Sequence, residues 1–555
     1  MQPQPTLSAT AISGQTFDYI VCGGGTSGCV IAAGIASIPD VSVLLIEAGR
    51  DSGLAPDVLV PGKYVKQLQE DKEGLWELET VPQPQLNARK LTFLRGKQIG
   101  GSSAVNYMAL ARGPAADYDE WAKIVGDDGW KWENILPLMK QLEDFDPKMP
   151  AYLEKFAAPR AGDHGASGPL KIGFGDEVVP GIETFIQACF ETGIPLCPDI
   201  NSGNPVGVGL AQFNVRDGER SYAANAFLGE SARASQNNLT IVTNTECDRL
   251  HSRDGVVTGV DLYDRLNEAL GCGQNMLDHS IITCEYKVNN SIPTHNQLFL
   301  DPAMLAKAEA QYEKDHTGPL AKFGSSGTLT FPRIQRLFES EEFSDLSTKE
   351  KDFLMEPTRP SAEIWLGSGP SVFQDDRPSE SYMTHELLLQ NNLSQGTVSI
   401  RSNNPRDQMI VNPNFMNHPF DRRIAIETVR MALKIARTKA YEGTIERMVH
   451  GPDIDFTTAD LDAIGDEVML DFIRQHLDQG YHSVSTCRMG RAGDPDVVVD
   501  ARFRVKGMKN LRVADLSVCP ILTCNHTQIN AYLIGLRCAK EMFESHKARH
   551  QQAKL

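Results

Sequence analysis

Several features are missing from this 555-residue sequence, and each absence excludes a class of protein. No apolar run reaches the roughly 18 residues of a membrane-spanning helix. Residues 1–15 have neither the basic nor the apolar region of a signal peptide. Basic residues are in deficit, and a net charge of −18 argues against nucleic acid or an anionic membrane as partner. We therefore expect an intracellular protein that acts on small molecules.

Paired cysteines are also missing. The eleven cysteines are an odd number and form no CxxC pair, so neither a disulfide framework nor a zinc site is indicated, and no metal is expected. An apolar content of 41% is that of an ordinary globular protein, and the length predicts more than one domain.

A glycine-rich motif stands near the N-terminus. The apolar run 18–22 leads into residues 23–28, followed by a small-residue helix over 29–36 and a second apolar run over 41–46. Strand, turn, helix and strand within about 30 residues have the size of one βαβ unit. The pattern predicts a dinucleotide site at the turn.

Each glycine of the motif has a physical task. Gly23 would make the turn, Gly25 would let the backbone approach a pyrophosphate, and Gly28 would let the helix pack closely on the strand. Glu47 falls at the tip of the second strand, where a carboxylate can take both hydroxyls of an adenosine ribose. A Gly-rich turn alone would be weak evidence, and the flanking strands, helix and acid strengthen it.

A second small-residue loop begins at Gly100 and Gly101 and continues with Ser102 and Ser103. It offers many backbone N–H and hydroxyl donors with little side-chain bulk, which suits a second contact with a large polar ligand. A flexible loop is the alternative, and the apolar and aromatic residues that follow it make that alternative weaker.

The stretch 95–107, with Arg112-Gly113 and residues 117–121 behind it, resembles the first signature of the glucose-methanol-choline (GMC) oxidoreductases, FAD enzymes that oxidise alcohols. Tyr107 after Asn106 is more like the aryl-alcohol-oxidising branch than the sugar oxidases. The resemblance implies an α/β fold, with a doubly wound FAD-binding (Rossmann-like) domain and a second α+β substrate domain built on an antiparallel sheet.

The resemblance also implies domain boundaries. A discontinuous FAD-binding domain is expected over 15–165, 200–280 and 451–548. A substrate domain is expected over 166–199 and 281–450, and an exposed tail over 549–555. Alternating residues predict strands over 396–401 and 407–413 of the antiparallel sheet, with a helix over 422–438 against it. Residues 497–505 and 511–515 are expected to return to the sheet as short strands.

His482 and His526 are the candidate catalytic residues. Each histidine alone would more often be structural, but their surroundings and their spacing of 44 residues resemble the family. By that resemblance His482 is the base that takes the hydroxyl proton, and His526 bonds the same hydroxyl and keeps its carbon at flavin N5. Ser485 and Leu516 depart from the glycine and alanine that the family usually has.

The expected cofactor is FAD. By resemblance its contacts would come from Gly23, Gly25, Thr26, Ser27, Gly28, Glu47, Gly100, Gly101, Ser102, Ser103, Asn106, Tyr107, Cys247 and Asp515.

One part of the family pattern is absent. After residues 255–261 the family continues with a further strand, a glycine-rich second signature and a helix before the motif matched here by 271–279. Only residues 262–270 lie between them, so about 40 to 50 residues of the FAD-binding domain are lacking. Two alternatives follow: a redox-silent cyclase or lyase that uses the histidines for proton transfer alone, and an inactive product of a faulty gene model.

The favoured function is FAD-dependent oxidation of a primary, bulky or aromatic alcohol to the aldehyde, with hydride transfer to flavin and oxygen or a quinone-like molecule as electron acceptor. The C-terminal residues 553–555 (Ala-Lys-Leu) are a conservative variant of a peroxisomal signal. Peroxisome and cytosol are both open as locations. Substrate identity and oligomeric state are not written in the sequence.

Overall fold

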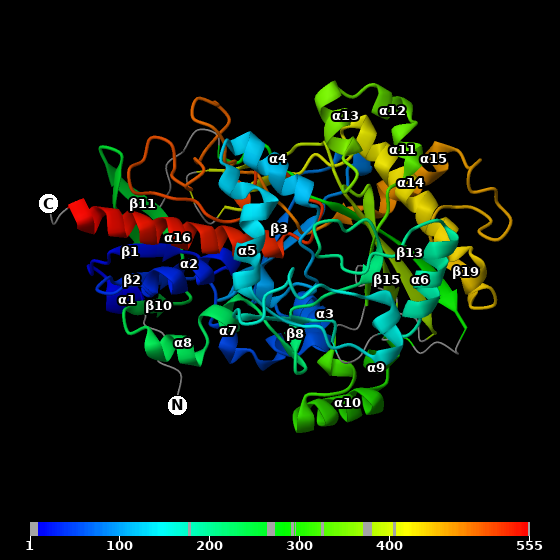
Figure 1. Cartoon of the computed structure of the whole chain (residues 1–555), viewed down its shortest axis with the longest axis horizontal. Helices are drawn as coiled ribbons and strands as arrows, with labels where there is room; N and C mark the ends of the chain where they lie inside the picture. Colours follow the sequence, from blue (N-terminus) through cyan, green and yellow to red (C-terminus); the bar gives the residue numbers. More distant parts are fainter. Residues whose placement is uncertain are drawn as a thin grey trace.

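The computed structural model describes residues 9–175, 179–262, 272–289, 294, 296–322, 327–369, 380–402, 404 and 407–552. Residues 263–271, which include all of the shortened stretch 262–270 except Leu262, and the tail 553–555 lie outside the described residues. The fold is of mixed α/β type and has two main sheets, which lie on the left and the right of Figure 1. No helix in the part of the chain that is described is both long and apolar enough to cross a membrane.

The smaller sheet is parallel and contains the predicted βαβ unit. Its strand order is β1-β2-β10, with β1 at Tyr19–Cys22, β2 at Val43–Ile46 and β10 at Leu239–Val242. β2 is buried along its whole length because it is paired on both sides. β1 pairs only with β2 among the described strands, and the side chain of Ile20 is 39% exposed. This sheet therefore ends at β1.

Two helices cross closely beside the smaller sheet. α2 (Thr26–Ala36) packs against α16 (Gln528–Gln552), the red helix in Figure 1. A Cβ added at Gly34 would lie 2.6 Å from Cβ of Ala539, and one added at Gly535 would lie 2.8 Å from the Ser27 carbonyl oxygen. Glycine at both positions lets the C-terminal helix lie directly on the first helix of the βαβ unit.

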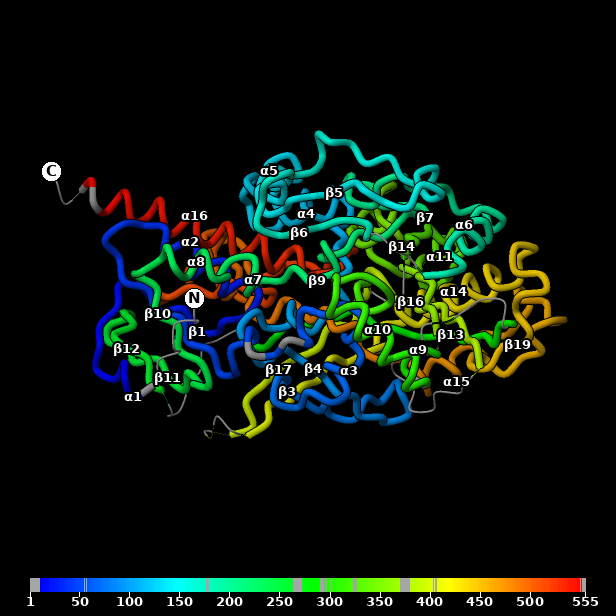
Figure 2. The backbone as a smooth tube through the Cα atoms, turned by 90° about the horizontal axis from the view of Figure 1, so that it is seen from below, coloured from blue at the N-terminus to red at the C-terminus, as the bar shows by residue number. Residues whose placement is uncertain are grey.

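The larger sheet is antiparallel, with seven strands in the order β19-β13-β16-β15-β14-β7, and β20 also pairs with β13. The strands are β7 (Gly207–Leu210), β13 (Ser280–Val288), β14 (Thr328–Phe331), β15 (Ala362–Ser368), β16 (Tyr382–Leu389), β19 (Ile445–His450) and β20 (Asp478–Gln479). Figure 2 shows them on the opposite side of the molecule from the hairpin β11 (Cys247–Arg253) and β12 (Val256–Leu262).

Alternating side chains give the larger sheet two different faces. Ile364 and Leu387 belong to the core that includes α14 (Pro419–Ala436), whereas Ile281, Trp365 and Leu388 belong to a second cluster on the other face. Successive residues of a strand point to opposite faces. One face is therefore closed by a helix, and the other is free to form the wall of a cavity.

Two expectations about strands are wrong. β17 (Thr397–Ser399) and β18 (Ile410–Asn412) pair only with each other among the described strands and do not join the larger sheet. Residues 497–505 and 511–515 form only isolated bridges, such as Val499 with Val505. Their β-branched residues fit a strand locally, but tertiary packing leaves them no long partner.

The remaining helices of eight or more residues surround the two sheets. They are α4 (Ala115–Val125), α5 (Trp132–Leu142), α6 (Ile182–Glu191), α10 (Pro302–Asp315), α13 (Thr348–Met355) and α15 (Asp466–His476). α5 ends at Leu142, because residues 143–146 form β5, which pairs with β6 (Leu170–Gly173).

Candidate active site

A cavity of about 1600 Å³ lies between the glycine-rich turn and the two histidines. It brings together most of the residues that the sequence singles out. Those that line it are Gly23, Gly25, Thr26, Ser27, Gly28, Gly101, Ser102, Ser103, Asn106, Tyr107, His482, Asp515 and His526. Glu47, Gly100 and Cys247 do not line it.

The turn after β1 has the backbone that its glycines predict. Gly23 has φ +99°, in the left-handed region that favours glycine. A Cβ on Gly28 would lie 2.0 Å from the Gly23 carbonyl oxygen, so the helix is packed against the turn. A Cβ on Gly25 would meet nothing within 4 Å, and the backbone there is open to the cavity beside the start of α2.

Glu47 stabilises the turn from behind. Its carboxylate accepts hydrogen bonds from Gly24 N at 2.7 Å and from Gly49 N at 2.9 Å. Burial raises the pKa of this carboxyl, and the two backbone N–H donors oppose that rise. In this structure Glu47 therefore shapes the nucleotide turn and does not itself line the cavity.

The second glycine loop lies directly against the first. Gly100 and Gly101 have φ +95° and +53°, and a Cβ on Gly101 would lie 2.7 Å from Cα of Gly25. The Ser103 hydroxyl donates to the Gly100 carbonyl at 2.6 Å. Gly100 is a packing position, because the ring of Tyr222 would lie 2.8 Å from an added Cβ. Close approach of the two loops explains why both are built from small residues.

His482 and His526 reach the cavity from separate segments. His482 lies in the loop after β20, and His526 lies just before α16. Their ring centroids are 5.2 Å apart, and the ring planes are inclined at 84°. Residues 44 positions apart are thus brought to one point, where both line the same cavity.

The environment of His482 favours the neutral ring. Burial lowers its pKa well below the ordinary value, and the neighbouring His279, His526 and Arg95 lower it further. A neutral imidazole at pH 7 can accept a proton from a substrate. The electrostatics therefore fit a general base at this position.

Three further residues hold the histidines, and sequence reasoning gave them no role. His526 Nε2–H donates to Glu363 Oε1 at 2.7 Å, from β15 of the larger sheet. His279 Nδ1 lies 2.9 Å from Nδ1 of His482, and the backbone N–H of His482 donates to Asp278 Oδ1 at 2.8 Å. Asp278 and His279 belong to the quoted motif 271–279, which was a usable signal. Glu363 had no such signal in the sequence, because only the fold of the larger sheet brings it to His526.

The wall beside the histidines is apolar and aromatic. Trp365 lies with its ring centroid 5.9 Å from that of His526, and Tyr107 stands edge-on to Tyr64 at 5.0 Å. Ile281 and Leu388 of the larger sheet complete this wall. Such a surface fits the hydrocarbon part of a bulky or aromatic ligand.

Ser485 explains why glycine is usual at its position in the family. Its φ is +76°, and the hydroxyl donates to the Cys519 carbonyl at 2.7 Å. The left-handed backbone costs about 1 kcal/mol for a residue with a Cβ, and a buried hydrogen bond offsets a cost of that size.

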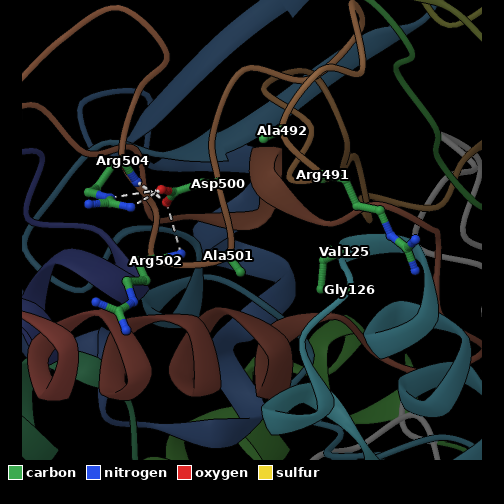
Figure 3. A pocket seen from close by; sticks show the side chains of 9 residues that line it. Val125, Gly126, Arg491, Ala492, Asp500, Ala501, Arg502 and Arg504 are labelled. Carbon is green, nitrogen blue, oxygen red and sulfur yellow. Dashed lines mark hydrogen bonds and ion pairs between the residues drawn. The ribbon is translucent and has the colours of Figure 1, made fainter.

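A second hollow, of about 510 Å³, lies near the end of α4 (Figure 3). Arg504 Nε donates to Asp500 Oδ2 at 2.7 Å, and Arg491 Nη2 donates to the Lys123 carbonyl at 2.8 Å. No histidine is found among the described residues that line it. Its cations are already paired, so this hollow is not the candidate site.

Two family models, both described as GMC oxidoreductase, match residues 17–288 and 392–535. The chain belongs to the GMC oxidoreductase family. A glucose methanol choline oxidoreductase of Aspergillus terreus is 28% identical, with 97% of this chain and 96% of that protein covered. Choline oxidase of Arthrobacter globiformis is 31% identical, covering 95% of this chain and 94% of that protein.

The fold is also that of solved GMC structures. A fungal aryl-alcohol oxidase superposes with a TM-score of 0.79 at 20% identity, covering 96% of this chain and 99% of that one. This GMC oxidoreductase is an FAD-dependent enzyme of the alcohol oxidase/dehydrogenase class.

Residues of the structure fit FAD. Open backbone at Gly25 and the start of α2 suit a pyrophosphate, and the cavity runs from there to the histidines without interruption. One region differs from the relatives. The alignment with the Aspergillus terreus protein spans 608 positions, more than the 555 residues of this chain, so that protein carries segments that this one lacks.

Proposed function

We propose that this GMC oxidoreductase oxidises a primary alcohol with a bulky or aromatic group to the aldehyde, with His482 and His526 as catalytic residues. The observation that carries the proposal is that His482 and His526 lie together in an apolar, aromatic part of the cavity, where burial lowers the pKa of His482. The glycine turns reach the same cavity from the opposite side, so substrate and cofactor sites would meet at the histidines.

The two histidines would divide the work. Hydride leaves an alcohol carbon readily only as the hydroxyl proton is removed, and the neutral ring of His482 is suited to accept that proton. His526 Nε2–H is committed to Glu363, so Nδ1 is the ring nitrogen left for the hydroxyl; with both ring nitrogens protonated, Nδ1–H would donate to the hydroxyl oxygen and orient it. When bound, FAD takes up the hydride. Glu363 would act as a positioning residue through His526.

The cavity wall would select the alcohol. Trp365, Tyr107, Ile281 and Leu388 present rings and branched chains next to the histidines. An aromatic ring would bury several times the apolar area in this wall that the two-carbon chain of ethanol buries. A difference of a few methylene groups already changes the preference of an enzyme between two substrates by about 10-fold or more. A bulky substrate is therefore favoured over ethanol.

The test is the visible absorption spectrum of the protein purified with FAD. Anaerobic addition of benzyl alcohol should bleach the flavin bands with a second-order rate constant at least about 10-fold above that for ethanol. Equal rates with ethanol would contradict the bulky substrate. Bleaching by neither alcohol, with FAD bound at one per chain, would contradict the proposed reaction.

A redox-silent cyclase or lyase is the second candidate, and the open edge of β1 favours it because that edge borders the cofactor side of the cavity. A colourless protein that excess FAD does not reconstitute, made from a verified transcript, would support this candidate. Reading the genomic sequence around Asp264 separates it from a faulty gene model, because a missed exon would restore the lacking segment in frame.

We further propose oxygen or a quinone-like molecule as electron acceptor. Reoxidation of the reduced enzyme by air, with peroxide formed in equal amount, would identify an oxidase. Reoxidation by a soluble quinone alone would identify a dehydrogenase.

Location in the peroxisome is proposed on the tail residues 553–555. An N-terminal fluorescent fusion should appear in peroxisomes and become diffuse when the last three residues are deleted. A diffuse signal in both forms would indicate the cytosol as the location instead.

The division into domains is also a proposal. An FAD-binding domain over 15–165, 200–280 and 451–548 would contain the whole parallel sheet, and a substrate domain over 166–199 and 281–450 would contain most of the antiparallel one. β7 and β20 join the larger sheet from stretches assigned to the FAD-binding domain. These two strands would tie the domains together.

A further inference from the structure

Two cysteine side chains meet at the edge of the cavity, outside the proposed chemistry. Sγ of Cys272 and Sγ of Cys487 are 3.0 Å apart. Cys272 is exposed and lines the cavity, whereas Cys487 is 8% exposed. Both carry free thiols. The separation is shorter than an ordinary contact between unbonded sulfur atoms, so the pair is already close to bonding distance.

The backbone holds the two thiols in this position. The N–H of Gly273 donates to the Thr486 carbonyl at 2.7 Å. Leu277 and Val484 exchange both of their backbone hydrogen bonds, at 3.2 and 2.8 Å. The stretches 272–277 and 484–487 therefore run antiparallel side by side. An S–S bond of about 2.05 Å needs an approach of about 1 Å, which rotation of the two side chains can supply.

The two thiols differ in reactivity. The Cys487 thiol donates a hydrogen bond to the sulfur of Cys272 and thereby lowers the Cys272 pKa, whereas the pKa of Cys487 is raised by the same contact. An exposed thiolate is the form that attacks oxidants, and a neighbouring thiol can resolve the product. Cys272 is suited to the first role and Cys487 to the second.

We propose that Cys272 and Cys487 form a redox modification site, which a hydroperoxide converts into an intramolecular disulfide. The Cys272 thiolate attacks one peroxide oxygen, the O–O bond breaks, and the leaving oxygen takes a proton. The Cys487 sulfur then attacks the sulfenic sulfur, the S–O bond breaks, and water leaves with the Cys487 proton. Two thiols lose two electrons, and hydrogen peroxide becomes two molecules of water.

The disulfide would act on the histidine loop. One bonded stretch continues into Asp278 and His279, and the other begins two residues after His482. The His482 backbone is already bonded to Asp278. A covalent bond between the two stretches would fix the distance between them, which sets the position of His482. It would also oppose the separation of the two stretches on unfolding. The site itself does not depend on the proposed function, because thiol oxidation is measured without turnover.

The experiment treats the full-length, FAD-loaded protein with hydrogen peroxide and maps its peptides by mass spectrometry without reduction. We expect one cross-linked pair that contains Cys272 and Cys487, lighter by two hydrogen atoms than the two peptides and released by dithiothreitol. Cys272→Ser and Cys487→Ser should each lack it. Cys22→Ser is the matched control, because Cys22 is also exposed and is also hydrogen-bonded to a second thiol, that of Cys247. The Cys22→Ser variant should keep the cross-link.

Three results would overturn the proposal. They are oxidation of Cys272 to a sulfinic acid without a cross-link, a disulfide between other cysteines in place of this one, and the same pair of peptides in Cys272→Ser. If either serine variant folds poorly, the map of the wild-type protein decides the matter by itself.

Discussion

The two sheets of this enzyme are supported to very different degrees. The antiparallel sheet has seven strands and one face closed by α14. The parallel sheet has three among the described residues, and β1, which leads into the nucleotide turn, is its edge there. In a doubly wound fold the first strand is normally central, because a crossover continues the sheet on its other side. The segment expected from the sequence to be lacking would thin the cofactor side and spare the substrate side.

This difference teaches where the fold tolerates a loss. The proposed cofactor contacts come from three separate places that line the cavity, which are the turn at Gly23, the loop at Gly101 and the loop at Asp515. None of them lies in the lacking stretch. α16 also packs against α2, the helix that follows the turn. The turn therefore has support that does not depend on a strand beside β1.

The largest effect is expected from removing the base on the substrate side. His482→Ala should lower kcat by roughly 10²-fold or more while FAD stays bound, because the change removes only the proton acceptor. In the wild-type enzyme the acid limb of kcat/KM should lie below pH 6.5, the ordinary histidine pKa, since that of His482 is lowered. Steady-state kinetics over pH measure both.

His450→Ala is the matched control for this change. His450 packs against His476, away from the cavity, and the variant should keep its turnover. Full activity in His482→Ala would remove His482 from the mechanism.

A pair of truncations tests the difference between the sheets. Leu387→Ala in β16 removes a side chain that is 0% exposed and should cost about 2–5 kcal/mol of the free energy of unfolding. Ile20→Ala at the edge in β1 should cost less than about 1 kcal/mol, because that side chain is 39% exposed. Urea denaturation measures both. Equal losses of stability would mean that the side chains of β1 are buried to the same extent as those of a central strand.

Glu386 gives the larger sheet a pH-dependent stability. Burial, with the nearby charge of Glu285, raises its pKa to about 8. The folded protein therefore holds a proton that the unfolded chain, with a carboxyl pKa near 4.5, releases. This contribution to stability falls as pH rises from about 4.5 to 8, by at most about 1.4 kcal/mol per pH unit.

Glu386→Gln keeps the neutral shape and removes this loss. Its advantage in urea denaturation over the wild type should grow from pH 5 to pH 8. Exposed Glu133→Gln should follow the wild type at every pH. A constant difference for Glu386→Gln would show that the carboxyl is charged in the folded state.

The cofactor side is tested at Glu47. Glu47→Ala removes the acceptor of two backbone N–H groups that shape the turn, and FAD should be partly lost on gel filtration. Glu47→Gln keeps one carbonyl acceptor and should retain more FAD than the alanine variant. The ratio of flavin to protein absorbance measures this, and full occupancy in both variants would exclude a role in cofactor binding.

The smallest effect is expected at Ser485, in the loop between the sheets. Ser485→Gly relieves the left-handed backbone but loses the hydroxyl bond, so its stability should stay within about 1 kcal/mol of the wild type. Ser485→Ala loses the bond and keeps the strain, and it should be the less stable of the two. The reverse order in thermal denaturation would show that the bond does not offset strain.

Local sequence by itself determined the family, the nucleotide turn and the position of the histidines in the chain. These depend on short-range physics: Gly23 needs φ +99°, Gly28 needs to be without a Cβ, and β2 needs an unbroken apolar run. Such requirements leave a mark on consecutive residues. The shortened stretch before residue 271 was visible for the same reason.

Tertiary structure alone decided the rest. Glu363 meets His526 only because β15 places it there, Glu47 turns to backbone N–H groups rather than to the cavity, and residues 497–505 find no long strand to pair with. The thiols of Cys272 and Cys487 are 215 residues apart in sequence and 3.0 Å apart in space. Contacts between distant segments depend on how whole sheets pack, and no local pattern of residues records them.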